Sequence, residues 1–205
     1  MLHVNTHALI LYAVFGLVAF GWRTWLQWRR TGDTGLRIHA TVGTMQWWAK
    51  LAFVAAILCG LAAPIAGLLG LDPVPALDTT TIHVVGVALG GLGVAATAFA
   101  QWQMGASWRI GVDESEHTGL VTHGVFGMVR NPIFTAMVLT ATGITLMVGN
   151  AVAITGLVTL VLALELQVRH VEEPYLLRTH PDAYRRYAST AGRFIPRFGR
   201  LVTRP

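Results

Sequence analysis

The chain has 205 residues, of which 54% are hydrophobic and only 12% are charged, and its mean hydropathy is +0.55. Soluble domains carry about 25% charged residues, so this composition excludes an ordinary soluble domain, and its apolar content excludes a disordered chain. Cys59 is the only cysteine, which excludes a small domain held together by disulfides. We therefore expect an all-α, polytopic integral membrane protein that forms a single domain over residues 1–205.

Charge-free stretches predict where the first three helices cross the membrane. The first covers residues 1–22, with its apolar part from Ala8 onward, and it ends at Arg23 beside tryptophans typical of a membrane interface. The second covers residues 51–71. The third lies between Asp78 and Arg109. These helices make up an N-terminal part, residues 1–104, followed by a C-terminal part, residues 105–205.

The next apolar stretch is too long for one helix. Residues 131–164 contain no charged side chain, and a single helix of that length would measure about 51 Å, against a hydrocarbon core of about 30 Å. Gly149-Asn150 lies in its middle and is a turn signal. We therefore predict two short spans, about 132–148 and about 151–168, joined as a C-terminal helical hairpin, which brings the count to about five transmembrane helices.

The basic residues predict the orientation of these spans. All 15 lysines and arginines lie in residues 23–50, residues 105–131 and the C-terminal tail. Cytoplasmic loops carry the excess of Lys and Arg, so we expect the N-terminus outside and the C-terminus in the cytoplasm. The net charge of +5 then reflects contact with anionic lipid headgroups rather than nucleic acid. No cleavable signal peptide is expected, because no Lys or Arg precedes the first apolar run. The Ala-, Gly- and Arg-rich composition is typical of a bacterial cell membrane protein.

Two polar segments next to the hairpin carry the possible chemistry. Asn131-Pro132 predicts a helix start, with Asn as the N-cap and Pro in the first turn, and Arg130 precedes it. Such a helix start attracts an anionic group, but on spacing alone ordinary capping beside an interfacial arginine is the favoured interpretation.

Glu172-Glu173 closes the fifth span, where a hydrated helix end is the alternative to a binding site. Antiparallel helices place these acids level with Arg130, where Glu172 would face the arginine or a bound cation. The pair of segments would suit a zwitterion, such as an amino acid or a cofactor with an amino-acid end. Glu165, two turns earlier, is expected to point into the bundle.

Several motifs in residues 107–196 resemble the isoprenylcysteine carboxyl methyltransferase family and the related phospholipid methyltransferases. In chain order, they are Leu120-Val121-Thr122-x-Gly124-Val125-Phe126, Arg130-Asn131-Pro132-x-Phe134, Glu172-Glu173-x-x-Leu176, Tyr184-x-x-Tyr187 and Arg193-Phe194-Ile195-Pro196. Asn131 and Phe134 stand where the family signature has His and Tyr. Arg169 is one residue away from the position at which the family often has an arginine.

The resemblance implies an integral membrane enzyme that transfers a methyl group from S-adenosyl-L-methionine to a lipophilic or prenylated substrate in the bilayer. It implies catalytic roles for Arg130 and Glu173, and a C-terminal segment that folds over the cofactor through Tyr184 and Tyr187. It also implies a cofactor pocket on the cytoplasmic side, lined by Leu120, Val121, Phe126, Asn131, Pro132, Phe134 and Glu172.

Other functions remain open from the sequence. Carboxyl O-methylation competes with N-methylation of a phospholipid or another amine, and with an NADPH-dependent membrane reductase acting on isoprenoids or sterols. A non-catalytic membrane protein with the same fold is a further alternative. No metal is expected, because His117 and His123 do not form a zinc-ligand spacing. Gly86 and Gly90 are expected to let helices pack closely. The sequence does not predict an oligomeric state.

Overall fold

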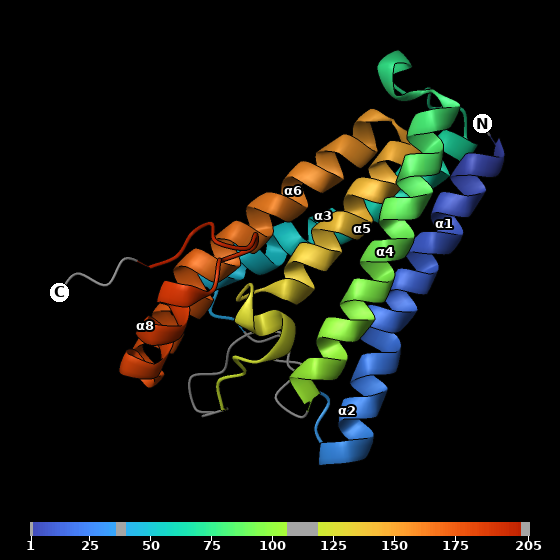
Figure 1. Ribbon diagram of the computed structural model, residues 1–205. Coiled ribbons are helices and arrows are strands. Elements are labelled where there is room, and N and C mark those ends of the chain that lie inside the picture. Colours follow the sequence, from blue (N-terminus) through green and yellow to red (C-terminus); the bar gives the residue numbers. More distant parts are fainter. Residues whose placement is uncertain (1, 36–39, 106–118, 202–205) are drawn as a thin grey trace.

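The computed structural model describes residues 2–35, 40–105 and 119–201 (Figure 1). All regular elements within these ranges are helices, apart from an isolated bridge between Val129 and Gly192. The segment 107–113 and His117, which the sequence analysis considered, lie outside the described residues. The chain therefore has the all-α architecture predicted from its composition.

The first helix is longer than its hydropathy predicts. Helices α1 (Leu2–Gly16), η1 (Leu17–Trp22, a π-helical segment) and α2 (Arg23–Thr31) join into one continuous helix. The predicted end at Arg23 is wrong, because this arginine is buried in the bundle and its guanidinium donates a hydrogen bond to the carbonyl oxygen of Gly105. Since Arg23 is accommodated inside the protein, it does not mark the end of the helix.

Four more helices complete the membrane region: α3 (Met45–Leu68), α4 (Thr80–Met104), α5 (Pro132–Val148) and α6 (Ala151–Gln167). A short 3₁₀ helix, η2 (Pro75–Leu77), lies in the connection between α3 and α4. Four of the helices in the described chain are long and apolar enough to cross a membrane, and α5 is a shorter apolar helix of 17 residues. This arrangement confirms the predicted polytopic fold.

The predicted hairpin lies between α5 and α6. Gly149 adopts a left-handed conformation with φ of 66° and ends α5, a conformation that glycine adopts without steric cost. Asn150 is completely buried, and its side chain accepts a hydrogen bond from the amide of Ala153 (3.0 Å) while donating one to the carbonyl oxygen of Ala63 in α3 (2.9 Å). The turn signal read from the sequence is confirmed at these residues.

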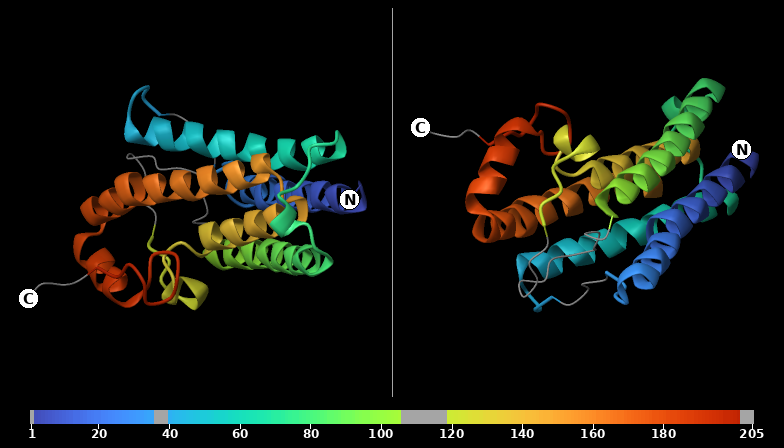
Figure 2. Two further views of the ribbon diagram at one scale, coloured as in Figure 1. Left: turned by 90° about the horizontal axis from the view of Figure 1, so that it is seen from above. Right: turned by 60° about the horizontal axis from the view of Figure 1, so that its bottom comes forward.

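The hairpin lies between two other helices. Helix α4 packs along α5, and α3 packs along α6, as the view from above in Figure 2 shows. Small residues allow the α4–α5 contact: a Cβ atom added to Gly143 would lie 2.3 Å from the amide nitrogen of Gly90 and 2.6 Å from the carbonyl oxygen of Gly86. The predicted packing role of Gly86 and Gly90 is confirmed.

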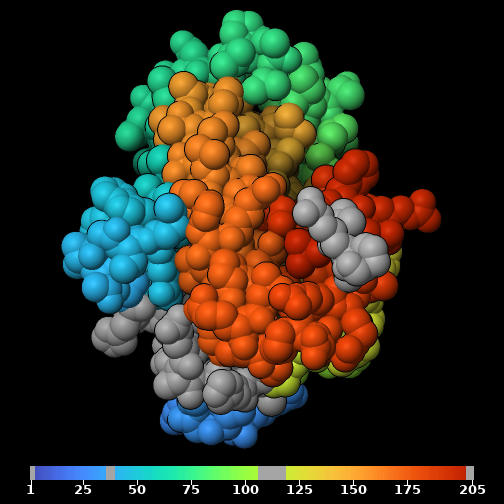
Figure 3. Space-filling model, turned by 90° about the vertical axis from the view of Figure 1, so that its left-hand side faces the viewer, coloured from blue at the N-terminus to red at the C-terminus, as the bar shows by residue number. Residues whose placement is uncertain are grey.

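The C-terminal elements turn back along the hairpin. Helix α6 continues through the π-helical segment η5 (Val168–Glu172) into α7 (Glu173–Thr179), and α8 (Pro181–Thr190) comes next. The residues after α8 return to the start of α5, where the amide of Arg130 donates to the carbonyl oxygen of Gly192 (2.7 Å) and the amide of Gly192 donates to that of Met128 (3.1 Å). Figure 3 shows this C-terminal part packed beside the long face of α6. These contacts bring residues more than 60 positions apart to the same end of the bundle.

Candidate active site

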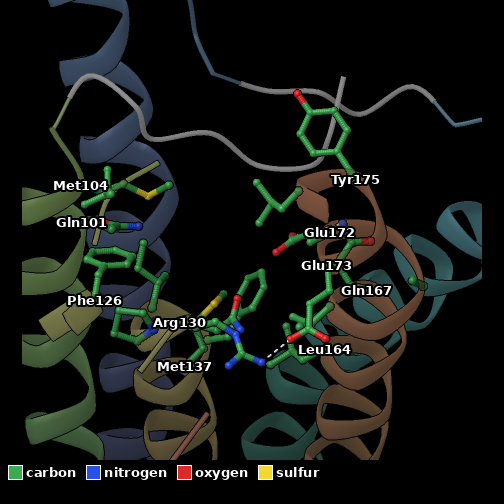
Figure 4. A pocket seen from close by; sticks show the side chains of 18 of the residues that line it. Gln101, Met104, Phe126, Arg130, Met137, Leu164, Gln167, Glu172, Glu173 and Tyr175 are labelled. Carbon is green, nitrogen blue, oxygen red and sulfur yellow. Dashed lines mark hydrogen bonds and ion pairs between the residues drawn. The ribbon is translucent and has the colours of Figure 1, made fainter. Parts of the chain in front are cut away.

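A cavity of about 270 Å³ lies at the end of the bundle where α5 begins and α7 and α8 fold back (Figure 4). Residues from both halves of the chain line it. All nine residues that the sequence analysis predicted for the site are among them: Leu120, Val121, Phe126, Arg130, Asn131, Pro132, Phe134, Glu172 and Glu173. The hairpin thus brings Arg130 and the two acids together, as predicted from its antiparallel geometry.

Arg130 is the central connector of this end of the molecule. Its side chain is almost completely buried, and Nη2 lies 2.6 Å from Oε1 of Glu173. Its guanidinium also donates to the carbonyl oxygens of Ala191 (2.7 Å), Gly199 (3.0 Å) and Ala188 (3.2 Å). Arg130 therefore joins the start of α5 to α7, to α8 and to the C-terminal segment. Nε is the one nitrogen of this guanidinium for which the described residues provide no hydrogen-bond partner.

Glu173, not Glu172, is the acid that pairs with the arginine. Its Oε1 accepts from both Arg130 and Nε of Arg193 (2.8 Å), and its Oε2 accepts from Nη2 of Arg193 (2.8 Å). Hydrogen bonding to Glu173 raises the pKa of Arg193 above its ordinary value. Of the two alternatives for Glu172, a contact with Arg130 is wrong, because the buried carboxylate between the two guanidinium groups is that of Glu173. The other alternative, a bound cation, stays a prediction.

The π-helical segment η5 decides which acid faces which way. The amide of Glu173 donates to the carbonyl oxygen of Val168, five residues earlier, instead of four. This extra residue in the turn rotates α7 relative to α6. Glu172 then points into the cavity in Figure 4, and its carboxylate accepts a hydrogen bond only from the side chain of Gln167 (3.2 Å) among the described residues. Glu172 is thus an acidic side chain at the cavity wall, and no cationic side chain among the described residues pairs with it.

Asn131 does not cap α5 through its side chain, contrary to prediction. Its side-chain amide donates to the carbonyl oxygen of Arg193 (3.1 Å), and its backbone amide donates to the same oxygen (3.2 Å). Pro132 does occupy the first position of the helix, as predicted. The difference is tertiary, since the carbonyl oxygen of Arg193 in the returning C-terminal segment orients the carboxamide by accepting from its Nδ2. Asn131 therefore ties this segment to the helix start.

Aromatic side chains form another wall. Phe126 lies in the 3₁₀ helix η4 (Gly124–Gly127), which α4 positions because the side chain of Gln103 accepts a hydrogen bond from the amide of Val125 (2.8 Å). Tyr187 donates its hydroxyl to the carbonyl oxygen of Phe126 (2.7 Å) and packs edge-on against Tyr184 with ring centroids 6.1 Å apart. Burial raises the pKa of Tyr187 to about 12 and that of Tyr184 above its ordinary value. Both hydroxyls therefore stay protonated at neutral pH.

Glu165 does not point into the bundle. It is partly exposed and pairs with Arg169, four residues later on the outer surface of α6 and η5. Neither residue lines the cavity. The prediction for Glu165 is wrong, because the flanking positions Val161 and Leu162 on the same stretch also face outward.

The N-terminal helices contribute residues that the sequence analysis did not assign to the site. Phe20 in η1, Lys50 and Phe53 in α3, and Gln101 and Met104 in α4 all line the cavity. Lys50 is the only lysine in the chain and stands at the edge of an apolar run, a signal that could have identified it. The π-helical form of η1 has no comparable signal, because nothing in its composition distinguishes it from an α-helix.

Comparisons with known proteins agree with this architecture. The family model of phospholipid methyltransferases matches residues 81–183. A solved structure of the eukaryotic intramembrane Ras methyltransferase ICMT (isoprenylcysteine carboxyl methyltransferase) is similar, with a TM-score of 0.71 and 17% sequence identity over 97% of this chain and 68% of that chain. A search of curated proteins finds no significant match. The chain therefore belongs to the phospholipid methyltransferase family and is an integral membrane methyltransferase with an ICMT-like fold.

Proposed function

We propose that the protein transfers a methyl group from S-adenosyl-L-methionine to a lipophilic substrate that resides in the membrane. The observation that carries this proposal is Glu172, a carboxylate at the wall of a largely apolar cavity with no cation partner in the described chain. A buried charge without a partner is unfavourable, so the acid is suited to receive a positively charged group from a ligand. The family and the fold support the same reaction class.

The residues at the cavity fit an amino-acid end and a ring. Glu172 would hold an ammonium group, and the start of α5 at Pro132 would attract a carboxylate because helix N-termini favour anions. Phe126 and Phe134 present apolar side chains at the same cavity and would contact an adenine. S-Adenosyl-L-methionine supplies, when bound, an electrophilic methyl group on a sulfonium. The chain's own contribution is to orient the two reactants and exclude water, which are effective means of catalysis for a single displacement.

We propose that Arg130 and Glu173 act by positioning. Their charged atoms are engaged with each other, with Arg193 and with backbone carbonyl groups. This network would fix the start of α5 against α7 and thereby set the distance between Asn131 and Glu172, which both line the cavity. Tyr184 and Tyr187 are buried side chains of α8, and they would form the wall that closes the cavity on the side of this network.

The acceptor is proposed to carry an anionic group. Lys50 lines the cavity from α3, alongside Phe53 and Met104, so an apolar chain with a carboxylate end finds both a matching wall and a matching charge there. An amine acceptor would be repelled by the ammonium group of Lys50. This favours carboxyl O-methylation over N-methylation of a phospholipid or another amine.

The proposal is tested by binding of S-adenosylhomocysteine to the purified protein in detergent. Replacing Glu172 by Gln should weaken binding by roughly 10-fold or more, since a hydrogen bond to a charged group contributes about 1.5–3 kcal/mol. The matched control is Glu165→Gln, which removes a carboxylate on the same helix outside the cavity and should leave affinity unchanged. Equal affinity in Glu172→Gln would remove this residue from the site.

The reaction itself is tested with labelled S-adenosyl-L-methionine and membrane lipid extracts. Label should enter an organic-soluble product, and base-labile label would identify a methyl ester. Stabilisation by NADPH in place of S-adenosylhomocysteine, without any methyl transfer, would instead establish the reductase alternative. Absence of both binding and transfer would indicate a non-catalytic member of the fold.

We also propose that the cavity faces the cytoplasm of a bacterial cell, with the N-terminus outside. The basic residues support this, because Arg130, Arg193 and Arg169 lie at the end of the bundle that holds the cavity, and cytoplasmic loops carry the excess positive charge. A fluorescent-protein fusion to the C-terminus should fluoresce, whereas an alkaline phosphatase fusion at the same point should be inactive. The reverse pattern would invert the topology.

A further inference from the structure

A second hollow is lined by residues from the start of α1, the α3–α4 connection and the end of α5. Figure 1 shows these three segments together at the end of the bundle opposite the candidate active site. It has a volume of about 200 Å³ and is lined in part by Asn5, Asp72, Asp78 and His83. An adjoining hollow of about 450 Å³ shares Asp78 and His83 with it and extends along α4 to Val87. No residue of the candidate active site contributes to either hollow.

Asn5 is the first observation that points to a ligand. The residue is 8% exposed and lines the smaller hollow. Its carboxamide lies against the backbone of α3, because a Cβ atom added to Gly67 would be 2.6 Å from its Nδ2 and 2.7 Å from its Oδ1. Within the described chain, no hydrogen-bond partner satisfies this side chain. Neither atom of this carboxamide is among the fully buried unpaired atoms of the described chain, so the amide is open to the hollow, where it can bind a polar group that enters.

The charges around the hollow select the sign of that group. Asp78 and Asp72 both line it, and Nε2 of His83 lies 3.5 Å from Oδ1 of Asp78. The sequence contains no lysine or arginine in residues 1–22 or 51–108, the stretches that supply most of these walls. The basic side chains that line the two hollows are histidines, His83 beside Asp78 and His7 in the adjoining hollow. Since no lysine or arginine is among the described lining residues, the two carboxylates favour a cation over an anionic headgroup.

The position of the hollow matches the depth of a lipid headgroup. Helix α4 has 25 residues, or about 37 Å, which exceeds the hydrocarbon core of about 30 Å, so the helix is long enough for its first turn to reach the headgroup region. His83 lies in that first turn, while Val84 and Val87 on the same helix are 63% and 51% exposed and line the adjoining hollow. A polar hollow thus continues into an apolar surface that faces lipid.

We propose that this end of the protein binds a phospholipid through its ammonium headgroup. The ammonium lies between Asp78 and Asp72, the Oδ1 of Asn5 accepts one of its hydrogen bonds, and the acyl chains run along Val84 and Val87 of α4. The site is separate from the cavity of the proposed methyl transfer, and it serves to fix the ends of α1, α3, α4 and α5 in the leaflet on that side.

The test uses lipid titrations of the delipidated protein in detergent, followed by native mass spectrometry. Phosphatidylethanolamine should bind about 10-fold more tightly than phosphatidylglycerol with the same acyl chains, because one charge-assisted hydrogen bond contributes that much. Asp78→Asn should abolish the preference while phosphatidylglycerol binding stays the same. Asn5→Leu should weaken phosphatidylethanolamine binding. If this substitution of a buried residue prevents folding, Asp78→Asn, at the more exposed rim of the hollow, still tests the proposal.

Two controls make the test specific. Asp182→Asn removes an exposed carboxylate of α8 at the other end of the molecule and should keep the wild-type preference. Each variant should also bind S-adenosylhomocysteine as the wild type does, which separates this site from the active site. Equal affinity for the two lipids, an unchanged preference in Asp78→Asn, or displacement of the lipid by free ethanolamine at equal concentration would overturn the proposal.

Discussion

Replacing Glu173 by Gln tests whether the network around Arg130 holds the site together. The carboxylate accepts three hydrogen bonds from two guanidinium groups, and the side chains of Arg130 and Glu173 are only 2% and 8% exposed. The substitution removes the negative charge but keeps one oxygen that can accept. Two buried positive charges then remain close together without compensation.

The expected cost depends on this burial. Removing one partner of a buried ion pair destabilises a protein by about 3–5 kcal/mol, and the remaining acceptor places Glu173→Gln near 3 kcal/mol. For a chain of this size, each kcal/mol shifts the melting temperature by about 2–4 °C, so Tm should fall by about 6–12 °C. The control Glu165→Gln disrupts the exposed pair with Arg169 and should shift Tm by no more than about 4 °C, since exposed pairs contribute at most about 1 kcal/mol.

Thermal unfolding in detergent, monitored by intrinsic tryptophan fluorescence, measures both variants beside Glu172→Gln. The last variant should keep the wild-type Tm and lose affinity for S-adenosylhomocysteine, whereas Glu173→Gln should lose stability first. If Glu173→Gln melts with the wild type but no longer binds the cofactor, Glu173 contacts the ligand directly and the positioning role is refuted.

Two further variants examine the packing. Gly143→Ala should separate α4 from α5, because the new Cβ would lie 2.3 Å from the backbone nitrogen of Gly90. A cost of about 1–3 kcal/mol is typical of overpacking. The control Gly91→Ala, whose new Cβ would have no atom within 4 Å, should melt with the wild type. Tyr187→Phe should lower Tm through loss of the hydrogen bond to Phe126, by about 1 kcal/mol. Since the pKa of Tyr187 rises from 10.0 to about 12 on folding, its contribution is complete below pH 10 and is lost as pH rises through 12. The gap between the wild-type and variant Tm values should therefore narrow over that range, and a constant gap would contradict the assignment.

The sequence was sufficient to place the apolar helices along the chain, apart from the end of the first one. Charge-free length predicted the spans, and Gly149-Asn150 predicted the hairpin turn where α5 ends and α6 begins. These signals are local, because hydropathy depends on composition and a turn depends on a few residues. The same information predicted that Arg130 and Glu173 lie at the same end of the bundle. Once the turn of an antiparallel hairpin is located, the relative depth of residues on its two helices is fixed.

Rotation about each helix axis was decided only by the tertiary structure. Neighbouring residues on a helix point about 100° apart, and one π-helical turn changes this phase for all later residues of the helix. For that reason Glu173 pairs with Arg130 while Glu172 faces the cavity. Glu165 lies before this turn, and its outward direction follows from how α6 packs in the bundle.

Long-range contacts also lay beyond the sequence. The C-terminal segment takes both amide groups of Asn131, Arg23 donates to a carbonyl group just after α4 inside the bundle, and Lys50 reaches a cavity built mainly by residues more than 50 positions later. Each depends on which surfaces meet when five helices pack together. The chain's composition thus determines that it is a membrane protein and where it crosses, whereas helix packing determines which of its few charges meet at the site.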